Sequence, residues 1–388
     1  MNQTPSSERI HIAFFGRRNV GKSSLVNAFT GQTLSIVSDV KGTTTDPVSK
    51  AMELLPLGPV QIIDTPGFDD EGTSLGDLRV QRTLKVFTEA DIVILVTDAT
   101  QPLCAQEKAF LEKVRRRGLP HLLVRNKADL ISDTPREGIL TSAVTGQGIE
   151  ELKQRTAALT VEEKRQPLVS DLLSPGDTVV LVVPIDKSAP KGRLILPQQQ
   201  AIRDILDAGA GAWVCRDTEL AQDLATLPKP PKLVITDSQV FDKVASIVPD
   251  SVPLTSFSIL MARCKGDLPL LAEGLRGLEN LKNGDRILIA EGCTHHRQCE
   301  DIGTVKLPRL LRRYTGIEPE FVFVSGKDFP EDLSSFKWVI HCGGCMQTQK
   351  QLQHRLDQCR SAGIPVTNYG LLLAHLNGIL PRAIEPLI

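Results

Sequence analysis

Eight residues near the N-terminus limit the fold of this chain more than any other feature. The run Gly16-Arg17-Arg18-Asn19-Val20-Gly21-Lys22-Ser23 satisfies the pattern G-x-x-x-x-G-K-S. It lies between an apolar segment, Ile10–Phe15, and a helix-like segment, Lys22–Phe29, which is the strand-loop-helix setting that the pattern requires. Such a loop turns backbone N–H groups toward phosphate oxygens, while the lysine reaches the terminal phosphates and the serine hydroxyl binds Mg²⁺. The run therefore predicts a nucleotide-binding loop at the start of an α/β domain.

Length and charge restrict the class of protein further. The chain has 388 residues, with 45 basic against 46 acidic side chains, which is long enough for two or three domains. This near-neutral balance favours neither a nucleic acid nor a membrane as a partner. The N-terminus lacks a signal peptide pattern, and no apolar run approaches the roughly 18 residues that a spanning helix needs. We therefore expect a cytoplasmic protein.

Strand-like and helix-like segments alternate from end to end, which predicts α/β architecture with largely parallel sheets. We expect three domains, at residues 1–167, 175–265 and 266–388, each built on such a sheet. The polar, Pro- and Gly-marked stretch Gln166–Asp177 is predicted to be a linker, and Leu268–Leu281 a helix. The middle block contains no recognisable chemistry.

Three further motifs follow the loop in the order that a GTPase needs. Asp64-Thr65-Pro66-Gly67 ends a predicted strand, and its Asp can hold Mg²⁺ through water while the Gly67 N–H meets the γ-phosphate. Asn126-Lys127-Ala128-Asp129 ends another strand, and its final carboxylate can accept two hydrogen bonds from guanine, a donor pair that adenine lacks. Ser142-Ala143 would place a backbone N–H on guanine O6. Four elements in order predict GTP specificity.

Cysteines mark a second site in the last third of the chain. Five of the eight cysteines lie after residue 290. Cys293 follows the predicted strand Ile287–Ala290, and the C-x-x-C pair Cys342 and Cys345 follows the predicted strand Trp338–His341. Because ligands collect at the carboxyl ends of parallel strands, the three thiolates converge if these strands are neighbours.

Three thiolates admit two metal sites. Zinc would take Cys293, Cys342, Cys345 and one histidine, His295 or His341, as a closed tetrahedral structural site. A [4Fe–4S] cluster would take the three cysteines and leave one iron with an exchangeable ligand, and glycines 343 and 344 could offer N–H groups to its sulfides. Buried thiols or a redox pair are the third interpretation, and it is the one to which we assign four cysteines elsewhere, Cys104, Cys215, Cys264 and Cys359.

The N-terminal block resembles the TrmE–Era–septin-type GTPases through Gly16–Ser24, Gly42-Thr43-Thr44-Thr45-Asp46 and Asp64–Gly67. In that group a threonine of the second motif coordinates Mg²⁺, for which Thr43, Thr44 and Thr45 are candidates and Thr44 is favoured. Phe68 stands where Ras-like enzymes carry the glutamine that orients water, so unaided hydrolysis should be slow. The resemblance also implies that Asn19 helps to hold an activating K⁺; a loop-stabilising hydrogen bond is the alternative.

These motifs and the resemblance define the predicted nucleotide site. The catalytic candidates are Lys22, Ser23, Thr44, Asp64 and Gly67, and the residues expected to bind the nucleotide are Gly16, Asn19, Val20, Gly21, Lys22, Ser23, Ser24, Asp64, Asn126, Lys127, Asp129, Ser142 and Ala143.

The whole chain resembles the HydF family of [FeFe]-hydrogenase maturation GTPases. The resemblance rests on Cys293-Thr294-His295, then about 45 residues before His341-Cys342-Gly343-Gly344-Cys345, behind the GTPase block, and on Asn368-Tyr369-Gly370. It implies a [4Fe–4S] cluster on Cys293, Cys342 and Cys345, with Glu300, His295 or His341 as the exchangeable fourth ligand. Cys299 is an extra thiol beside the site that could compete for iron.

The family resemblance also implies a function. It describes a GTP hydrolase, dimeric through its middle domain, that holds a di-iron precursor of the H-cluster and delivers it to the apo-[FeFe]-hydrogenase, with radical-SAM maturation enzymes as further partners. The alternative is a regulatory or RNA-modification GTPase whose C-terminal domain contains structural zinc. A third possibility is a pure switch with turnover too slow to count as catalysis.

Overall fold

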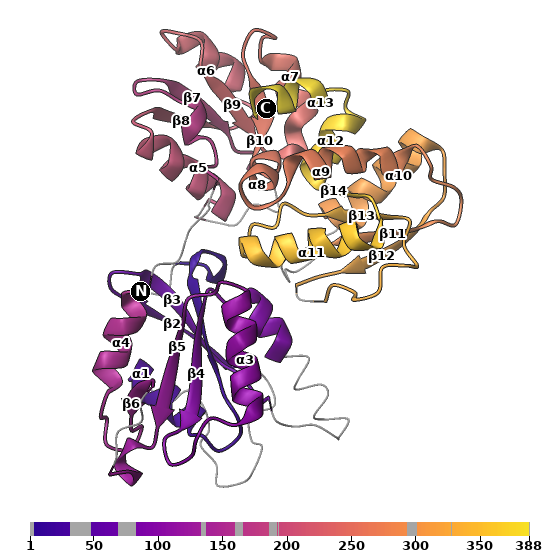
Figure 1. The fold of residues 1–388 in the computed structure, drawn as a ribbon. Helices are drawn as coiled ribbons and strands as arrows, with labels where there is room; N and C mark the ends of the chain where they lie inside the picture. Colours follow the sequence, from indigo (N-terminus) through magenta and orange to yellow (C-terminus); the bar gives the residue numbers. More distant parts are fainter. Residues whose placement is uncertain are drawn as a thin grey trace. The chain divides into compact units, whose positions relative to one another are not determined.

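Apolar segments that alternate with helices form three sheets, as the sequence predicts. The structure is a computed structural model that describes residues 4–31, 48–68, 83–132, 137–159, 166–185, 192, 194–292, 301–326 and 328–387. The chain forms two compact units, Met1–Glu163 and Lys164–Ile388 (Figure 1).

The first unit contains a sheet of the order β2-β3-β1-β4-β5-β6 within the described residues. Every neighbouring pair is parallel except β2 and β3, which are antiparallel. The strands are β1 (Ile10–Phe15), β2 (Val48–Leu54), β3 (Gly58–Asp64), β4 (Ile92–Asp98), β5 (His121–Asn126) and β6 (Ile139–Thr141).

Helices cover both faces of this sheet, because side chains along the central strand point alternately to opposite faces. Ile12 and Phe14 belong to one apolar core, with Leu25 and Phe29 of α1 and Leu152 of α4. Ala13 and Phe15 belong to the other, which includes Phe87 from the helical residues 83–89 and Leu111 of α3. The helices are α1 (Lys22–Thr30), α3 (Ala105–Arg116) and α4 (Ile149–Ala157).

The second unit contains two fully parallel sheets, of the orders β10-β9-β7-β8 and β12-β11-β13-β14 in its described part. The first consists of β7 (Thr178–Val182), β8 (Gly211–Cys215), β9 (Leu233–Thr236) and β10 (Leu254–Ser256). The second consists of β11 (Arg286–Ala290), β12 (Glu320–Val324), β13 (Trp338–His341) and β14 (Val366–Asn368).

One apolar core joins these two sheets, so they behave as a single packed body. Its helices are α5 (Leu196–Asp207), α6 (Leu220–Thr226), α7 (Phe241–Ile247), α8 (Phe257–Lys265), α9 (Leu268–Glu273), α10 (Leu307–Thr315), α11 (Gln349–Ala362), α12 (Tyr369–Leu376) and α13 (Leu380–Ile384). The single helix predicted at Leu268–Leu281 is wrong: α9 ends at Glu273, and a 3₁₀ segment, Gly274–Leu278, follows. Gly274 approaches Val366 so closely that a Cβ there would lie 1.8 Å from the Val366 carbonyl oxygen.

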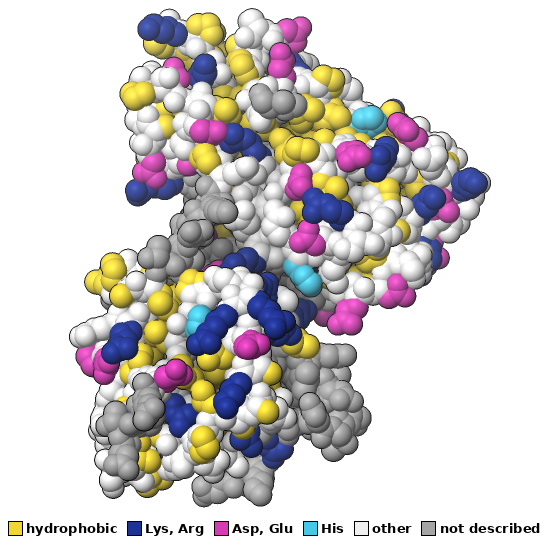
Figure 2. Space-filling view, viewed as in Figure 1, with side chains coloured by type: hydrophobic (Ala, Val, Ile, Leu, Met, Phe, Trp, Pro, Cys, Tyr) yellow, Lys and Arg dark blue, Asp and Glu magenta, His cyan; other side chains and the backbone are white. Residues whose placement is uncertain are grey.

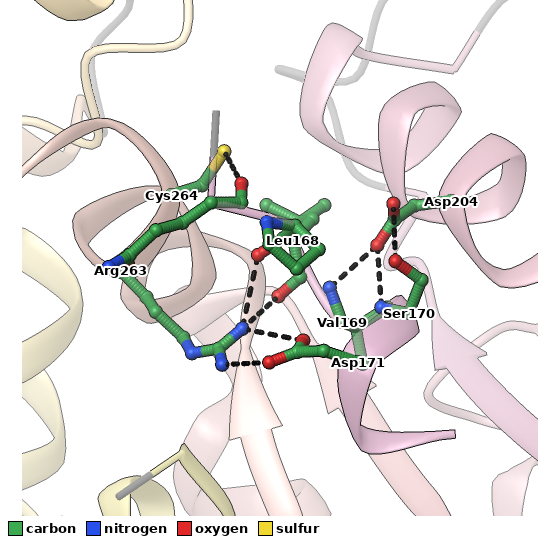
Figure 3. A network of polar contacts seen from close by, with 9 residues as sticks. Leu168, Val169, Ser170, Asp171, Asp204, Arg263 and Cys264 are labelled. Atoms are coloured by element: carbon green, nitrogen blue, oxygen red, sulfur yellow. Dashed lines mark hydrogen bonds and ion pairs between the residues drawn. The ribbon is translucent and has the colours of Figure 1, made fainter. Parts of the chain in front are cut away.

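The predicted linker is also partly wrong, because its first residues belong to the packed second unit. Leu168 and Val169 are 5% and 0% exposed. Figure 3 shows how polar groups hold residues 166–171, which we call the leading segment, from two sides: Arg263 of α8 pairs with Asp171, and Asp204 of α5 accepts the Val169 and Ser170 N–H groups. The sequence gives no sign that Leu168 and Val169 are buried, because the residues around them are mostly polar. The charged residues 161–165 lie outside the described residues.

No helix among the described residues is both long and apolar enough to cross a membrane.

Candidate functional site

The phosphate-binding loop joins β1 to α1, as predicted, and its shape depends on two glycines. A Cβ at Gly16 would lie 2.4 Å from the Val96 carbonyl oxygen. Gly21 has φ +80°, in the left-handed region that disfavours side chains, and a Cβ there would lie 2.4 Å from Asn126 Nδ2. That amide donates to the Val20 carbonyl oxygen at 2.9 Å, so the base-recognition motif braces the phosphate loop.

Three residues predicted for phosphate and Mg²⁺ binding meet at the start of α1. Lys22 Nζ lies 3.2 Å from Asp64 Oδ1, and the Ser23 hydroxyl donates to Asp64 Oδ2 at 2.6 Å. Lys22 is 8% exposed and Asp64 is fully buried. The cation, the hydroxyl and the carboxylate are therefore already within reach of one another, which is the set that a phosphate and its Mg²⁺ require.

The base-recognition residues form one network because β5 pairs with β6. Asn126 lies opposite Thr141 in that pairing. The Ala143 N–H donates to Asn126 Oδ1 at 3.2 Å, and the Ser142 hydroxyl donates to Asp129 Oδ1 at 2.5 Å. Thus Ser142 orients the carboxylate that would receive guanine.

Lys127 of the same motif is fixed by a charged partner. Its Nζ lies 2.6 Å from Asp98 Oδ2, at the end of β4. Burial works to raise the pKa of Asp98, but hydrogen bonds from Lys127 and Thr100 outweigh it and lower that pKa below its usual value. The backbone of Lys127 lies in the left-handed region, at φ 71°.

Most of the remaining predicted residues of this site lie in the described part of the chain, and the three threonines do not. Asn19 is exposed and has φ 62°, and Ser24 and Gly67 are partly exposed. Phe68 stacks on Phe110, with ring centroids 5.1 Å apart and planes 15° apart, so an aromatic contact stands where Ras-like enzymes have a polar side chain. Thr43, Thr44 and Thr45 lie outside the described residues.

The three consecutive arginines at the end of α3, Arg115, Arg116 and Arg117, are exposed. Figure 2 shows several Lys and Arg side chains over α3, on the face of the first unit that is in view. Arg117 also donates to the Phe87 and Thr88 carbonyl oxygens, at 2.9 and 3.0 Å.

The loop that contains Cys342 and Cys345, which we call the cysteine loop, follows the carboxyl end of β13. The neighbouring strand β11 ends beside it. Ala290 pairs with His341, and the Cys342 N–H donates to the Ala290 carbonyl oxygen at 2.9 Å. Cys342 Sγ accepts two backbone hydrogen bonds, from the N–H of Gly292 at 3.0 Å and from that of Gly344 at 3.4 Å. Gly292 directly precedes Cys293 in the chain.

Several of the predicted metal ligands cannot be placed. Cys293, His295, Cys299 and Glu300 lie outside the described residues. Within the residues that are described, no group of three or more His, Cys, Asp or Glu side chains could hold a metal ion. The structure therefore describes only one of the two cysteine segments of the predicted site.

His341 is held by other groups on both ring nitrogens. Its Nδ1 lies 2.7 Å from the Cys342 carbonyl oxygen, and its Nε2 lies 3.0 Å from Arg355 Nη1. The ring is 1% exposed. Burial, together with the positive charge of Arg355, lowers its pKa to about 4. A neutral ring that donates through Nδ1 and accepts through Nε2 fits this geometry, and a metal at His341 would have to displace one partner.

Buried polar residues that the sequence reasoning did not assign surround the loop. The Tyr369 hydroxyl and Glu291 Oε1 lie against Gly303, where a Cβ would approach them to 2.2 and 2.7 Å. Burial raises the pKa of Tyr369 well above its usual value, and the nearby Cys342 and Glu291 add to the effect. Lys265 and Arg355 are the buried cations of this region, 8% and 7% exposed. Only the sequence run Asn368-Tyr369-Gly370 had pointed to any of these residues.

Two of the four cysteines predicted to be buried thiols fit that prediction and two lie nearer the surface. Cys215 and Cys359 are buried, and burial raises the pKa of each thiol to about 12. Cys104 and Cys264 are partly exposed, and the Cys264 thiol donates to the Gln166 carbonyl oxygen at 3.1 Å.

Three protein-family models match this chain. Residues 11–127 match the 50S ribosome-binding GTPase model, residues 168–266 the hydrogen maturase F dimerization domain, and residues 269–386 the hydrogen maturase F tetramerization domain. The two hydrogen maturase F models together cover more than half of the chain.

Curated relatives match part of the chain. The tRNA modification GTPase MnmE of Synechococcus elongatus is 36% identical over 161 residues, which is 37% of this chain and 34% of that protein. MnmE of Laribacter hongkongensis is 35% identical over 154 residues, 38% of this chain and 34% of that protein. The chain thus spans about a third of the length of these relatives.

Among solved structures, Aquifex aeolicus Era is 21% identical, with a TM-score of 0.35, over 53% of this chain and 93% of that one. The G domain of the T. maritima FeoB iron transporter is 26% identical, with a TM-score of 0.30, over 38% of this chain and 96% of that one.

The family models agree with the architecture: a parallel-rich GTPase sheet with a phosphate-binding loop, followed by two parallel sheets in the segments matched by the dimerization and tetramerization models. The second of these sheets supports the cysteine loop. This chain belongs to the hydrogen maturase F family.

Proposed function

We propose that the chain is a GTP hydrolase and iron–sulfur scaffold that holds the di-iron precursor of the H-cluster and delivers it to apo-[FeFe]-hydrogenase in the cytoplasm. GTP and Mg²⁺ would bind at Lys22, Ser23 and Asp64, with Thr44 as a further Mg²⁺ ligand and Asn19 as a K⁺ ligand. Residues 1–167 would bind GTP, 175–265 would dimerise, and 266–388 would hold the cluster. Radical-SAM maturation enzymes are the further partners of this proposal.

The observation that carries the cluster assignment is the hydrogen bond from Gly292 N–H to Cys342 Sγ, at 3.0 Å. It brings the backbone one residue before Cys293 against the sulfur of Cys342, which supports a site shared by both cysteine segments. N–H donors to sulfur are typical of iron–sulfur sites, because they stabilise negative charge on thiolates and sulfides.

The donor set fits a [4Fe–4S] cluster on Cys293, Cys342 and Cys345. Bound there, such a cluster would supply an iron with an exchangeable fourth position. Glu300 is our first candidate for that position and His295 the second. His341 ranks third, because both of its ring nitrogens already have partners. A weak oxygen or nitrogen ligand suits a scaffold that must release its cargo.

Metal analysis tests the proposal most directly. Wild type and Cys345→Ala are reconstituted anaerobically, and iron, sulfide and zinc contents are measured with the EPR spectrum after reduction. We expect a reducible [4Fe–4S] signal in wild type and its loss or strong weakening in the variant. Stoichiometric zinc without sulfide or EPR signal would overturn the scaffold and favour a GTPase with a structural zinc domain.

The K⁺ assignment has its own assay. GTP hydrolysis is measured in K⁺ and in Na⁺ at equal ionic strength, because a cation held by Asn19 would supply positive charge to the transition state. We expect faster hydrolysis in K⁺. Equal rates in both salts would remove Asn19 as a cation ligand, and no hydrolysis in either would leave a nucleotide switch.

A further inference from the structure

Lys265, the last residue of α8, contacts the cysteine loop although it lies 80 residues before Cys345 in the chain. Its Nζ donates to the carbonyl oxygens of Cys345 and Gln347, each at 3.0 Å. The side chain is 8% exposed, so the ammonium group is largely shielded from water. Its own backbone is fixed in turn, because the Gln353 amide donates to the carbonyl oxygens of Lys265 and Gly266, at 3.1 and 2.8 Å.

Lys265 brings a positive charge to the backbone of the loop at Cys345, because its Nζ is bonded to the Cys345 carbonyl oxygen. Cys342 Sγ accepts hydrogen bonds from the Gly292 and Gly344 N–H groups. Arg355, another buried cation of this region, donates to the Gly326 carbonyl oxygen and lies 3.0 Å from His341 Nε2.

We propose that Lys265 is a positioning residue for Cys345 and the fixed positive charge that stabilises the thiolate-ligated, anionic state of the cysteine loop. The inference rests on the proposed [4Fe–4S] site. Three thiolates outweigh the positive charge of an oxidised cubane core, so the assembly is anionic and becomes more so on reduction. A shielded cation bonded to the loop favours the reduced form of a bound cluster, because Coulomb attraction is strong where water is excluded.

A purely mechanical role would use the same hydrogen bonds, so the variants must separate charge from bonding. Lys265→Met removes both the charge and the donor. Lys265→Gln removes the charge and keeps an N–H donor for the loop carbonyls. Lys265→Arg keeps the charge. Lys337→Met is the matched control, because Lys337 is exposed and precedes β13, at the end of the strand opposite to Cys342.

The experiment measures the midpoint potential of the reconstituted full-length protein by EPR-monitored redox titration, together with iron per chain and a far-UV CD melt of the apoprotein. We expect the reduction equilibrium constant to fall about tenfold in Lys265→Met and Lys265→Gln, which is about 59 mV toward negative potential for one electron. Lys265→Arg and Lys337→Met should keep the wild-type potential. Failure of both neutral variants to load iron, with rescue by Lys265→Arg and folded apoproteins, would support the same role.

Wild-type potentials in Lys265→Met and Lys265→Gln would overturn the charge role and leave the proposed function intact. If Lys265→Met does not fold, Lys265→Gln decides the question alone, since it retains a donor. Equal shifts in Lys265→Arg and Lys265→Gln would show that geometry rather than charge matters and would also overturn it. Absence of any cluster in wild type would instead remove the proposed function, and this inference with it.

Discussion

The phosphate loop and the cysteine loop occupy equivalent places, at the carboxyl ends of parallel strands, yet they obtain their positive charge differently. The phosphate loop contains its own cation, since Lys22 belongs to the motif and contacts Asp64. The cysteine loop is approached by Lys265 of α8, a residue in the segment matched by the dimerization domain model. One loop contains a cation within its own sequence motif, and the other is contacted by a cation from a neighbouring helix.

The largest effect is expected from Lys22→Ala, which removes the motif cation. We expect GTP turnover to fall roughly 10²- to 10³-fold, because one preorganised charge contact to the transition state is lost. Phosphate release under saturating GTP measures it, and Lys108→Ala, an exposed change on α3, is the control. Iron loading of the second unit should not change. A parallel loss of iron would contradict the separation of the two sites.

The motifs explain why candidate residues for the phosphate site could be named almost one by one from the sequence. Glycine, lysine and serine at fixed spacing are required by local backbone geometry, so Gly21, Lys22 and Ser23 could be assigned before any tertiary contact was known. The brace from Asn126 to the Val20 carbonyl oxygen was not foreseen, because it depends on β1 and β5 flanking β4 in the sheet.

For the cysteine loop, the sequence indicated only candidate ligands. Cys342 and Cys345 are visible as a pair, but Lys265 lies 80 residues earlier in the chain, and no spacing rule connects it to them. Leu168 and Val169 were missed for a similar reason, since two apolar residues in a polar stretch carry no periodicity. Tertiary packing decided these features.

A change at Arg355 tests how far the cysteine loop depends on buried charge for stability. Arg355→Met removes the partner of His341 Nε2 and the bond to the Gly326 carbonyl oxygen, so a buried acceptor loses its donor. We expect a loss of about 2–3 kcal/mol in unfolding free energy. Both tryptophans of the chain, Trp213 and Trp338, lie in the second unit, so urea unfolding followed by their fluorescence reports on this unit.

Arg360→Met is the matched control for that change, because Arg360 lies on the same helix, α11, but half exposed, in surface ion pairs. Its effect should stay below about 1 kcal/mol. Equal losses of unfolding free energy in the two variants would mean that the buried Arg355 guanidinium stabilises the second unit no more than an exposed arginine does.

The smallest effect concerns the leading segment. Arg263, in the last turn of α8 near Lys265, holds this segment through Asp171 (Figure 3). The hydrogen bond from Arg263 is the main cause that lowers the pKa of Asp171, against an opposing effect of burial. A lowered carboxyl pKa means that the folded state binds protons less readily than the unfolded state. The pair therefore contributes its stability above the ordinary aspartate pKa of 3.8 and loses it as pH falls below that value, through the folded pKa.

Asp171→Asn should lower the unfolding free energy of the second unit by about 0.5–1 kcal/mol at pH 7, a figure limited by solvent screening because Asp171 is 39% exposed. The difference from wild type should persist to pH 4 and shrink below it, in fluorescence-monitored unfolding. Asp207→Asn, which breaks an exposed pair on α5, should change less. A difference that grows with acid would contradict the assignment. Since Arg263 and Lys265 share the last turn of α8, an unchanged cluster potential in Asp171→Asn would show that this turn holds the leading segment and the cysteine loop independently.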